Sequence, residues 1–353
     1  MLTLLRKLIG FTIIIASFLL AWQLWEYDLF NRLPLKVSEQ GQRINILPGT
    51  PFKLIVRSLS DNGIITKPRL FEWGARLKGK ASKVQAGEYH VPYGMLPNEL
   101  LDMFVAGKVV QYSFTLVEGW NLRQTLNALK QNPDITHTLT STDAEKVMQE
   151  LGLNVHHAEG WFFPDTYNFV RNTSDVALLK RAYAAMKKQL DEQWLQRDAG
   201  LPYMNPYQAL IMASIIEKET GVAEERQQIS GVFVRRLKKG MRLQTDPTVI
   251  YGIGESYDGN IRRKDLRSDT PYNTYTRKGL PPTPIAMPGQ AAIYAALHPA
   301  DGDSLYFVAS GNGAHVFSST LQQHNEAVIK YQLKGKRREF SSYSKNKNQK
   351  GQP

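Results

Sequence analysis

The segment NPYQALIMASIIEKETG, residues 205–221, carries the signals of a complete and buried helix. Its first asparagine is a favourable N-cap, Pro206 suits the first helical position, and the final glycine ends the helix. Its middle is apolar around almost the whole circumference, which predicts a helix enclosed by the rest of its domain. The same helix ends in two glutamates, Glu217 and Glu219. Burial of a carboxyl group costs free energy, so buried carboxyl groups are usually paired with other groups or serve in binding or catalysis.

The two glutamates project from different sides of this predicted helix. At 100° per residue they lie ~200° apart, so they cannot form a carboxylate pair in one cleft. Glu217 lies above the small side chains of Ala213 and Ser214, which leave room for a substrate, whereas Glu219 shares a side with larger residues such as Ile215. The spacing therefore favours Glu217 as the catalytic residue and gives Glu219 a structural or secondary role.

A carboxyl group in a partly apolar cleft can act as a general acid. Its ionised form is disfavoured there, so its pKa rises and the group stays protonated near neutral pH. Cleavage of a glycosidic bond requires such an acid. The alternative is that both glutamates only form ion pairs with nearby cations such as Lys218, Arg226 or Arg235.

Three loop segments that follow the helix are rich in amide, hydroxyl and aromatic side chains. They read MRLQTDPTVIY (241–251), PYNTY (271–275) and GLPPTPIAMP (279–288). Planar rings pack against the faces of sugars, and amides bind their hydroxyl and N-acetyl groups, so the loops favour a saccharide site. The alternative is that prolines fix ordinary loops around core tyrosines.

The N-terminal sequence predicts a membrane anchor. LIGFTIIIASFLLAWQLW (8–25) contains 18 residues without a charge, and as a helix it reaches ~27 Å, close to the thickness of a bilayer core. Arg6 and Lys7 precede it and acidic residues follow it, which places the N-terminus in the cytoplasm. No A-x-A cleavage signal follows, although a cleaved signal peptide and a buried helix are the alternatives.

Composition excludes several classes of protein. The chain has 353 residues and no cysteine, so it has no disulfide, thiolate nucleophile or Cys-ligated metal. The histidines lack ligand spacing, and no nucleotide-binding or α/β-hydrolase motif is present, so we expect no metal and no cofactor. The net charge is +12, but seven basic residues against one acidic residue lie in 334–353, which predicts a basic disordered tail. A chain that works outside the membrane is not expected to bind nucleic acid.

Several strings closely resemble the endolytic murein transglycosylase family, also called YceG-like. The strings are ASIIEKET (213–220), RLQTDPTVIYG (242–252), YNTYTRKGLPPTPIAMPG (272–289), HPA (298–300) and LYFVASGNGAHVFSSTLQQHN (305–325). The resemblance extends over nearly the whole chain and includes EGWFFPDTYNF (159–169). It maps the catalytic glutamate onto Glu217, and it places Gln244, Asp246, Tyr272 and Asn273 in segments expected to bind substrate.

The resemblance implies an α+β fold with four parts. They are a cytoplasmic tail (1–7), a transmembrane anchor (8–27), a LysM-like α/β module (43–110) and a mixed helical and β catalytic domain (111–333). The basic tail (334–353) lies beyond the region that the resemblance covers. Within the module, patterning predicts helices near 52–62, 68–78 and 97–106 and a strand at 86–91. A further strand is predicted at 305–309. The expected location is a bacterial inner membrane, with the catalytic domain in the periplasm.

The implied reaction is cleavage of the β-1,4 bond between N-acetylmuramic acid and N-acetylglucosamine inside peptidoglycan strands, without water, which leaves a 1,6-anhydromuramic end. The expected partners are the glycan strands and the penicillin-binding synthases that make them. Two alternatives stay open. A muramidase would add water with the help of Asp246, although Pro247 after it suggests a bracing role for this aspartate. A wall-binding scaffold would need only the 43–110 module and no catalysis.

Overall fold

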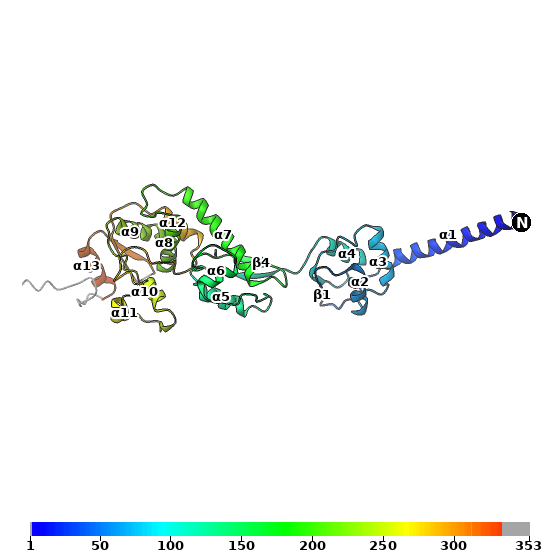
Figure 1. Cartoon of the computed structure of the whole chain (residues 1–353), viewed down its shortest axis with the longest axis horizontal. Coiled ribbons are helices and arrows are strands. Elements are labelled where there is room, and N and C mark those ends of the chain that lie inside the picture. Colours follow the sequence, from blue (N-terminus) through cyan, green and yellow to red (C-terminus); the bar gives the residue numbers. More distant parts are fainter. Residues whose placement is uncertain (1, 312, 334–353) are drawn as a thin grey trace, which may run out of the picture. The chain divides into compact units, whose positions relative to one another are not determined.

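The computed structural model describes residues 2–311 and 313–333, and the chain divides into two compact units (Figure 1). The first unit contains residues 1–113 together with Asn168–Asn172, and the second contains Phe114–Tyr167 and the chain from Thr173 onward. Both units mix helices and strands, so the predicted α+β class is confirmed. The predicted disordered tail, 334–353, lies outside the described residues.

The first unit is built from four helices and one antiparallel strand pair. Its elements are α1 (Leu2–Arg32), β1 (Gln42–Ile46), α2 (Phe52–Asp61), α3 (Pro68–Leu77), β2 (Gly87–Val91) and α4 (Pro97–Val105). Strands β1 and β2 pair antiparallel, with Gln42 opposite Val91 and Ile46 opposite Gly87. The helices close over the apolar side of this pair, and Leu59, Tyr89 and Phe104 are excluded from solvent. The three helices and the strand expected in 43–110 are therefore all present.

Helix α1 is long and apolar enough to cross a membrane, by length and composition. Its residues from Leu8 to Trp25 are largely exposed, but its last turns pack into the first unit. Phe30 is buried, the ring of Tyr27 meets the ring of Trp73 edge to face at 5.3 Å, and Lys67 Nζ lies 2.6 Å from Glu26 Oε1. The apolar stretch and the first folded unit thus share one unbroken helix.

The second unit is mainly helical. Its helices are α5 (Leu122–Gln131), α6 (Ala144–Glu150), α7 (Asp175–Leu195), α8 (Pro206–Glu219), α9 (Arg226–Lys238), α10 (Asp246–Ile253), α11 (Arg263–Arg267), α12 (Gln290–Leu297) and α13 (Leu321–Tyr331). Strands β5 (Tyr306–Ala309) and β6 (His315–Ser318) form an antiparallel pair, as the pattern at 305–309 indicated. Strands β3 (Tyr112–Thr115) and β4 (Thr166–Phe169) form another two-stranded sheet.

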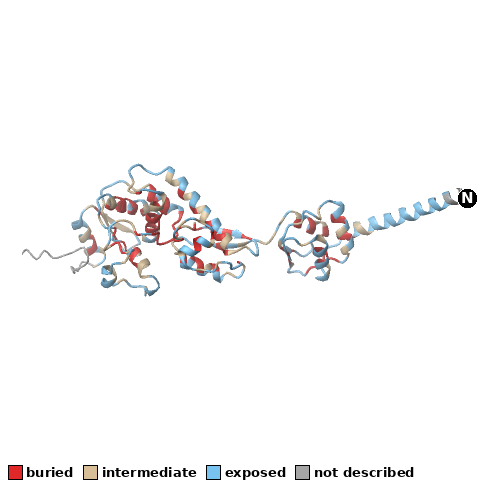
Figure 2. Cartoon of the chain, viewed as in Figure 1, coloured by how far each residue is buried: buried red, intermediate tan, exposed pale blue. Residues whose placement is uncertain are grey.

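Helix α8 is the centre of the second unit. Asn205 caps it by accepting a hydrogen bond from the Gln208 N–H at 3.1 Å, and every residue from Ala209 to Ile216 is buried. It packs against α12, α9, α7 and α10, and Figure 2 shows the buried residues gathered along it. The small residues of α12, such as Ala292 and Ala296, allow the two helix backbones to approach closely. The sequence prediction of an enclosed helix over 205–221 is confirmed.

Candidate functional site

The two glutamates at the end of α8 contact different segments of the second unit. Glu217 Oε2 accepts a hydrogen bond from the Gly289 N–H at 3.0 Å. Glu219 Oε2 accepts one from the Thr245 hydroxyl at 2.6 Å. Each carboxyl group is therefore held by a different segment of the chain, so the two groups have different surroundings.

The side of α8 that carries Glu217 is covered by the chain before α12. The Ile285 N–H donates to the Ser214 hydroxyl at 3.0 Å, and Ser214 and Ala213 are fully buried. The small side chains of Ala213 and Ser214 are therefore covered by this segment. Burial raises the pKa of Glu217, while the Gly289 N–H lowers it. Glu217 lines neither of the two cavities described below.

Glu219 lies instead on the wall of a cavity of about 690 Å³. The polar side chains around this cavity come from α8, α9, the loop before α10 and its first residue, the 271–275 loop, β6, and α13 with the residue after it; they are Glu219, Arg236, Gln244, Asp246, Tyr275, His315, His324 and Gln332. Aromatic rings from Tyr306 and Phe307 complete the wall. The volume is within the range of about 300–1,000 Å³ that ligand sites occupy. Two of the predicted substrate residues, Gln244 and Asp246, therefore meet Glu219 and not Glu217.

Burial raises the pKa of Glu219 to about 7. The hydroxyl of Thr245 opposes this rise by donating to the carboxyl, whereas the nearby carboxylate of Asp246 adds to it. The charges of His315 and Arg236 also lower the pKa. A carboxyl group with this pKa is protonated in a large fraction of molecules at neutral pH, which is the property that a general acid requires.

Several polar residues of the cavity are fixed by contacts with the protein. Asp246 Oδ1 accepts a hydrogen bond from the Tyr275 hydroxyl at 2.6 Å. The Arg236 guanidinium donates to the backbone carbonyls of Leu305 at 2.6 Å and Leu243 at 2.7 Å, and His315 Nδ1 lies 2.7 Å from Glu225 Oε2. Side chains held in this way are pre-organised for a ligand.

Gln244 has an unusual backbone conformation at the edge of the cavity. Its φ of 53° is in the left-handed region, which costs energy for a residue other than glycine. The strain is held by the neighbouring loop, since the Gln244 N–H donates to the Thr274 carbonyl and the Thr245 N–H donates to the Thr274 hydroxyl at 3.1 Å. The side chain of Gln244 stays exposed beside Glu219. Strain that a loop maintains in this way points to a functional position.

The other two predicted substrate residues lie elsewhere. The amide of Asn273 is 1 % exposed, donates to the carbonyls of Asp265, Leu266 and Ser268, and accepts the Tyr275 N–H at 2.9 Å. It braces the 265–275 loop and lines neither of the two cavities. Tyr272 lines a different cavity from Glu219, and its hydroxyl bonds that of Thr283 at 2.8 Å.

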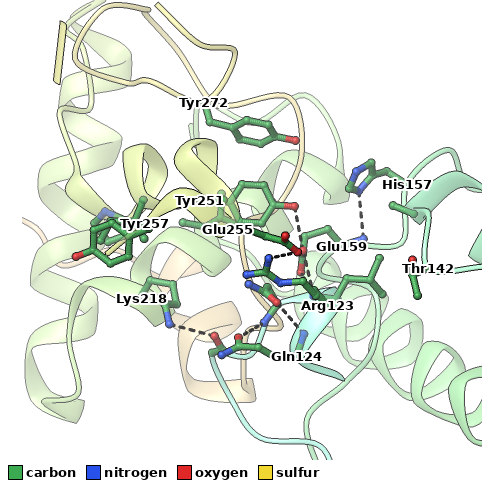
Figure 3. A pocket seen from close by; sticks show the side chains of 18 residues that line it. Arg123, Gln124, Thr142, His157, Glu159, Lys218, Tyr251, Glu255, Tyr257 and Tyr272 are labelled. Carbon is green, nitrogen blue, oxygen red and sulfur yellow. Dashed lines mark hydrogen bonds and ion pairs between the residues drawn. The ribbon is translucent and has the colours of Figure 1, made fainter. Parts of the chain in front are cut away.

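This other cavity, of about 650 Å³, contains a buried acid that the sequence interpretation missed (Figure 3). Glu159 is 2 % exposed, and burial raises its pKa to about 7. Its two carboxyl oxygens accept the Leu122 N–H at 3.0 and 3.1 Å, and Oε2 also accepts the Tyr251 hydroxyl at 3.0 Å. The position of Glu159 at the start of the EGWFFPDTYNF string was the available signal. Among the described residues, no three His, Asp or Glu side chains are grouped closely enough to hold a metal ion.

Comparison with known proteins gives consistent matches over most of the chain. Residues 44–330 match the sequence model of the YceG-like family. A protein of Bacillus subtilis strain 168 named endolytic murein transglycosylase is 35 % identical over 315 residues, which cover 84 % of this chain and 86 % of that protein. A protein of the same name from Streptococcus pneumoniae strain D39 is 26 % identical over 338 residues, which cover 86 % of this chain and 61 % of that protein. The crystal structure of a YceG-like protein from Listeria monocytogenes aligns with a TM-score of 0.51 at 30 % identity, covering 82 % of this chain and 99 % of that one.

Proposed function

Because this chain belongs to the YceG-like family, we propose that it is an endolytic lytic transglycosylase that cuts the glycan strands of peptidoglycan. The bond cleaved is the β-1,4 bond between N-acetylmuramic acid and N-acetylglucosamine, and the product carries a 1,6-anhydromuramic end. The observation that supports this function most directly is a buried carboxyl group, Glu219, in a cavity lined by amide, hydroxyl and aromatic side chains.

A single carboxyl group can serve both steps of this reaction. The protonated acid donates its proton to the glycosidic oxygen as the bond from that oxygen to C1 of the muramic acid breaks. The resulting carboxylate then removes the proton from the 6-hydroxyl of the same sugar while O6 bonds to C1. The carboxyl group ends in its starting state, and no water is consumed.

We assign this role to Glu219, whereas spacing and family resemblance favour Glu217. Glu219 shares its cavity with Gln244 and Asp246, while Glu217 is bonded to the Gly289 backbone and lines neither of the two cavities described above. In this assignment Glu217 fixes the loop before α12, and Gln244 is an exposed amide placed to bind the N-acetyl or hydroxyl groups of the substrate. The two glutamates can be separated by experiment.

The presence of Asp246 beside Glu219 favours a second candidate reaction, hydrolysis. A second carboxylate could activate water, as in ordinary glycosidases, and would produce a reducing end. Against this role, Asp246 begins α10 and is bound by the Tyr275 hydroxyl. Mass spectrometry of the fragments released from purified peptidoglycan decides between the two, because an anhydro end is lighter than a reducing end by one water.

The first unit is proposed to hold glycan, as a LysM-like module over residues 43–110. The strand, helix, helix, strand order of β1, α2, α3 and β2 supports this proposal. A non-catalytic scaffold is the remaining alternative, and it would tolerate loss of Glu219. Helix α1 is proposed to anchor the chain in a bacterial inner membrane, with the N-terminus in the cytoplasm and both folded units in the periplasm, beside penicillin-binding synthases.

A further inference from the structure

A cavity of about 250 Å³ lies in the first unit, beside the end of α1. We infer that it binds an anionic phospholipid of the bilayer that α1 crosses, with the lipid phosphate beside Lys36 and the upper part of an acyl chain against the apolar wall. This inference rests on the proposed membrane anchor and adds a lipid site to the first unit. Three features of the described residues support it.

The first feature is the position of the cavity along α1. The uncharged stretch of the helix ends at Trp25, and Leu29 on the cavity wall lies ~6 Å farther along the helix axis. The end of the helix at Arg32 lies ~10 Å beyond Trp25. Lipid head groups add about 5–8 Å on each side of the hydrocarbon layer. A helix that leaves the hydrocarbon near Trp25 therefore places this cavity among the head groups.

The second feature is an apolar wall that is partly open to solvent and fixed in place. Leu29 and Leu33 are 39 % and 56 % exposed on one side of the cavity, and the buried Ile64 and Ile65 lie on the other. The Lys36 N–H donates to the Ile64 carbonyl at 3.1 Å, so the chain after α1 is tied to this second side. Exposed leucines beside an apolar hollow are unfavourable in water, whereas a lipid chain covers them.

The third feature is the charge at the edge of the cavity. Two lysines line it, and Lys67 is already engaged, since its Nζ lies 2.6 Å from Glu26 Oε1. Asp28 is likewise paired with Arg32 at 2.9 Å. Lys36 is exposed, and its ammonium group has no partner within residues 2–311 and 313–333. A free ammonium binds phosphate as a point charge. An uncompensated cation next to an apolar wall matches the phosphate and the chain of an anionic phospholipid.

Native mass spectrometry of the full-length protein in detergent, titrated with phosphatidylglycerol, tests the role of the charge. Lys36→Gln should weaken binding about fivefold, which is the contribution expected from one basic residue near a lipid phosphate. Lys36→Arg keeps the charge and should bind like the wild type. Lys53→Gln removes an exposed lysine of α2 outside the cavity, so it is the matched control and should also bind like the wild type.

Fluorescence quenching in vesicles tests where the cavity lies. Because the chain has no cysteine, a single introduced cysteine can carry the fluorophore. Thr66→Cys labels an exposed residue of the cavity that is remote from α1 in sequence, and Leu47→Cys labels an exposed residue of the same unit outside the cavity. In vesicles that contain phosphatidylglycerol, lipids with a nitroxide on the head group should quench the Thr66 label several-fold more strongly than the Leu47 label. Addition of Lys36→Gln should reduce this difference.

The inference is wrong if Lys36→Gln and Lys53→Gln bind phosphatidylglycerol equally well, if phosphatidylcholine binds as tightly as phosphatidylglycerol, or if the lipid quencher acts equally on both labels. A Thr66 label that neither the lipid quencher nor a water-soluble quencher reaches would show that a protein covers the cavity instead. The proposed anchor is judged separately, because its failure would appear as wild-type protein that does not float with vesicles.

Discussion

The hydroxyl of Thr245 lies 2.6 Å from Oε2 of Glu219 and donates its hydrogen to that carboxyl group. This bond joins the residue before α10 to the last residue of α8, so the proposed acid and the loop that carries Gln244 and Asp246 are fixed to each other. Since the acceptor is favoured in its ionised form, Thr245 also limits how far burial raises the pKa of Glu219.

We expect Glu219→Gln to lower the rate of anhydro-end formation by about 10² to 10⁴-fold, because the amide cannot deliver and recover the proton. Glu217→Gln is the matched control on the same helix and should keep most of the activity. Turnover of purified peptidoglycan is the measurement, with circular dichroism to show that both variants are folded. The opposite pattern, a folded and inactive Glu217→Gln beside an active Glu219→Gln, would return the acid role to Glu217.

Thr245→Val should move the alkaline limb of the pH–rate profile upward by about one unit. The hydroxyl bond stabilises the carboxylate, so its loss raises the pKa of Glu219, and the acid then stays protonated to a higher pH. Thr245→Ser keeps a hydroxyl and should follow the wild-type profile. An alkaline limb that moved downward in the valine variant would show that Glu219 is not the titrating acid.

Stability should fall as the pH rises from about 4.5 to 7. The pKa of Glu159 is raised by burial from 4.5 to about 7, so the folded state holds a proton that the unfolded chain has already released. The corresponding stabilisation is fully present below pH 4.5, and on the order of 3 kcal/mol is lost as the pH passes through 7. Differential scanning calorimetry should show a flatter dependence of Tm on pH for Glu159→Gln, because glutamine does not titrate. Parallel curves for the two proteins would contradict this prediction.

Deletion of residues 43–110 should weaken binding to isolated sacculi and reduce activity on long strands more than on short fragments. The reason is that the first unit is proposed to hold glycan that lies outside the catalytic cavity. Activity on short fragments serves as the internal control for a folded second unit. Equal losses on both substrates would count against a binding role for this unit.

Replacement of α1 by a cleavable signal should leave the chemistry unchanged in vitro but alter glycan length in cells. Anchoring confines the enzyme to the layer where synthases release new strands and raises its local concentration beside them. Chromatography of glycan strands from cells with equal amounts of each protein measures the effect. Identical length distributions would show that anchoring does not affect the control of glycan strand length.

The sequence predicted those features that depend on local signals. Asn205, Pro206 and the apolar run after them predicted α8 and its burial, and local patterns predicted α2, α3, α4 and β2 of the first unit but not β1. The choice between Glu217 and Glu219 depends on which distant segment covers each side of α8. Ile285 occupies the space above Ser214, a contact between residues 71 positions apart that periodicity cannot indicate. The left-handed backbone of Gln244 and the burial of Glu159 are set by long-range packing for the same reason.

The continuity of α1 with the first unit has a mechanical consequence. A helix of 31 residues is ~46 Å long, about 16 Å more than the hydrocarbon layer of a bilayer. Because Phe30 is buried in the core and Tyr27 packs on Trp73, the helix is joined to the unit by packed side chains and not by a flexible linker. If α1 spans the bilayer, any tilt that it adopts to match the thickness of the membrane is passed on to the first unit by the same angle. A change in lipid composition that alters the thickness of the bilayer would then change the orientation of this unit toward the wall.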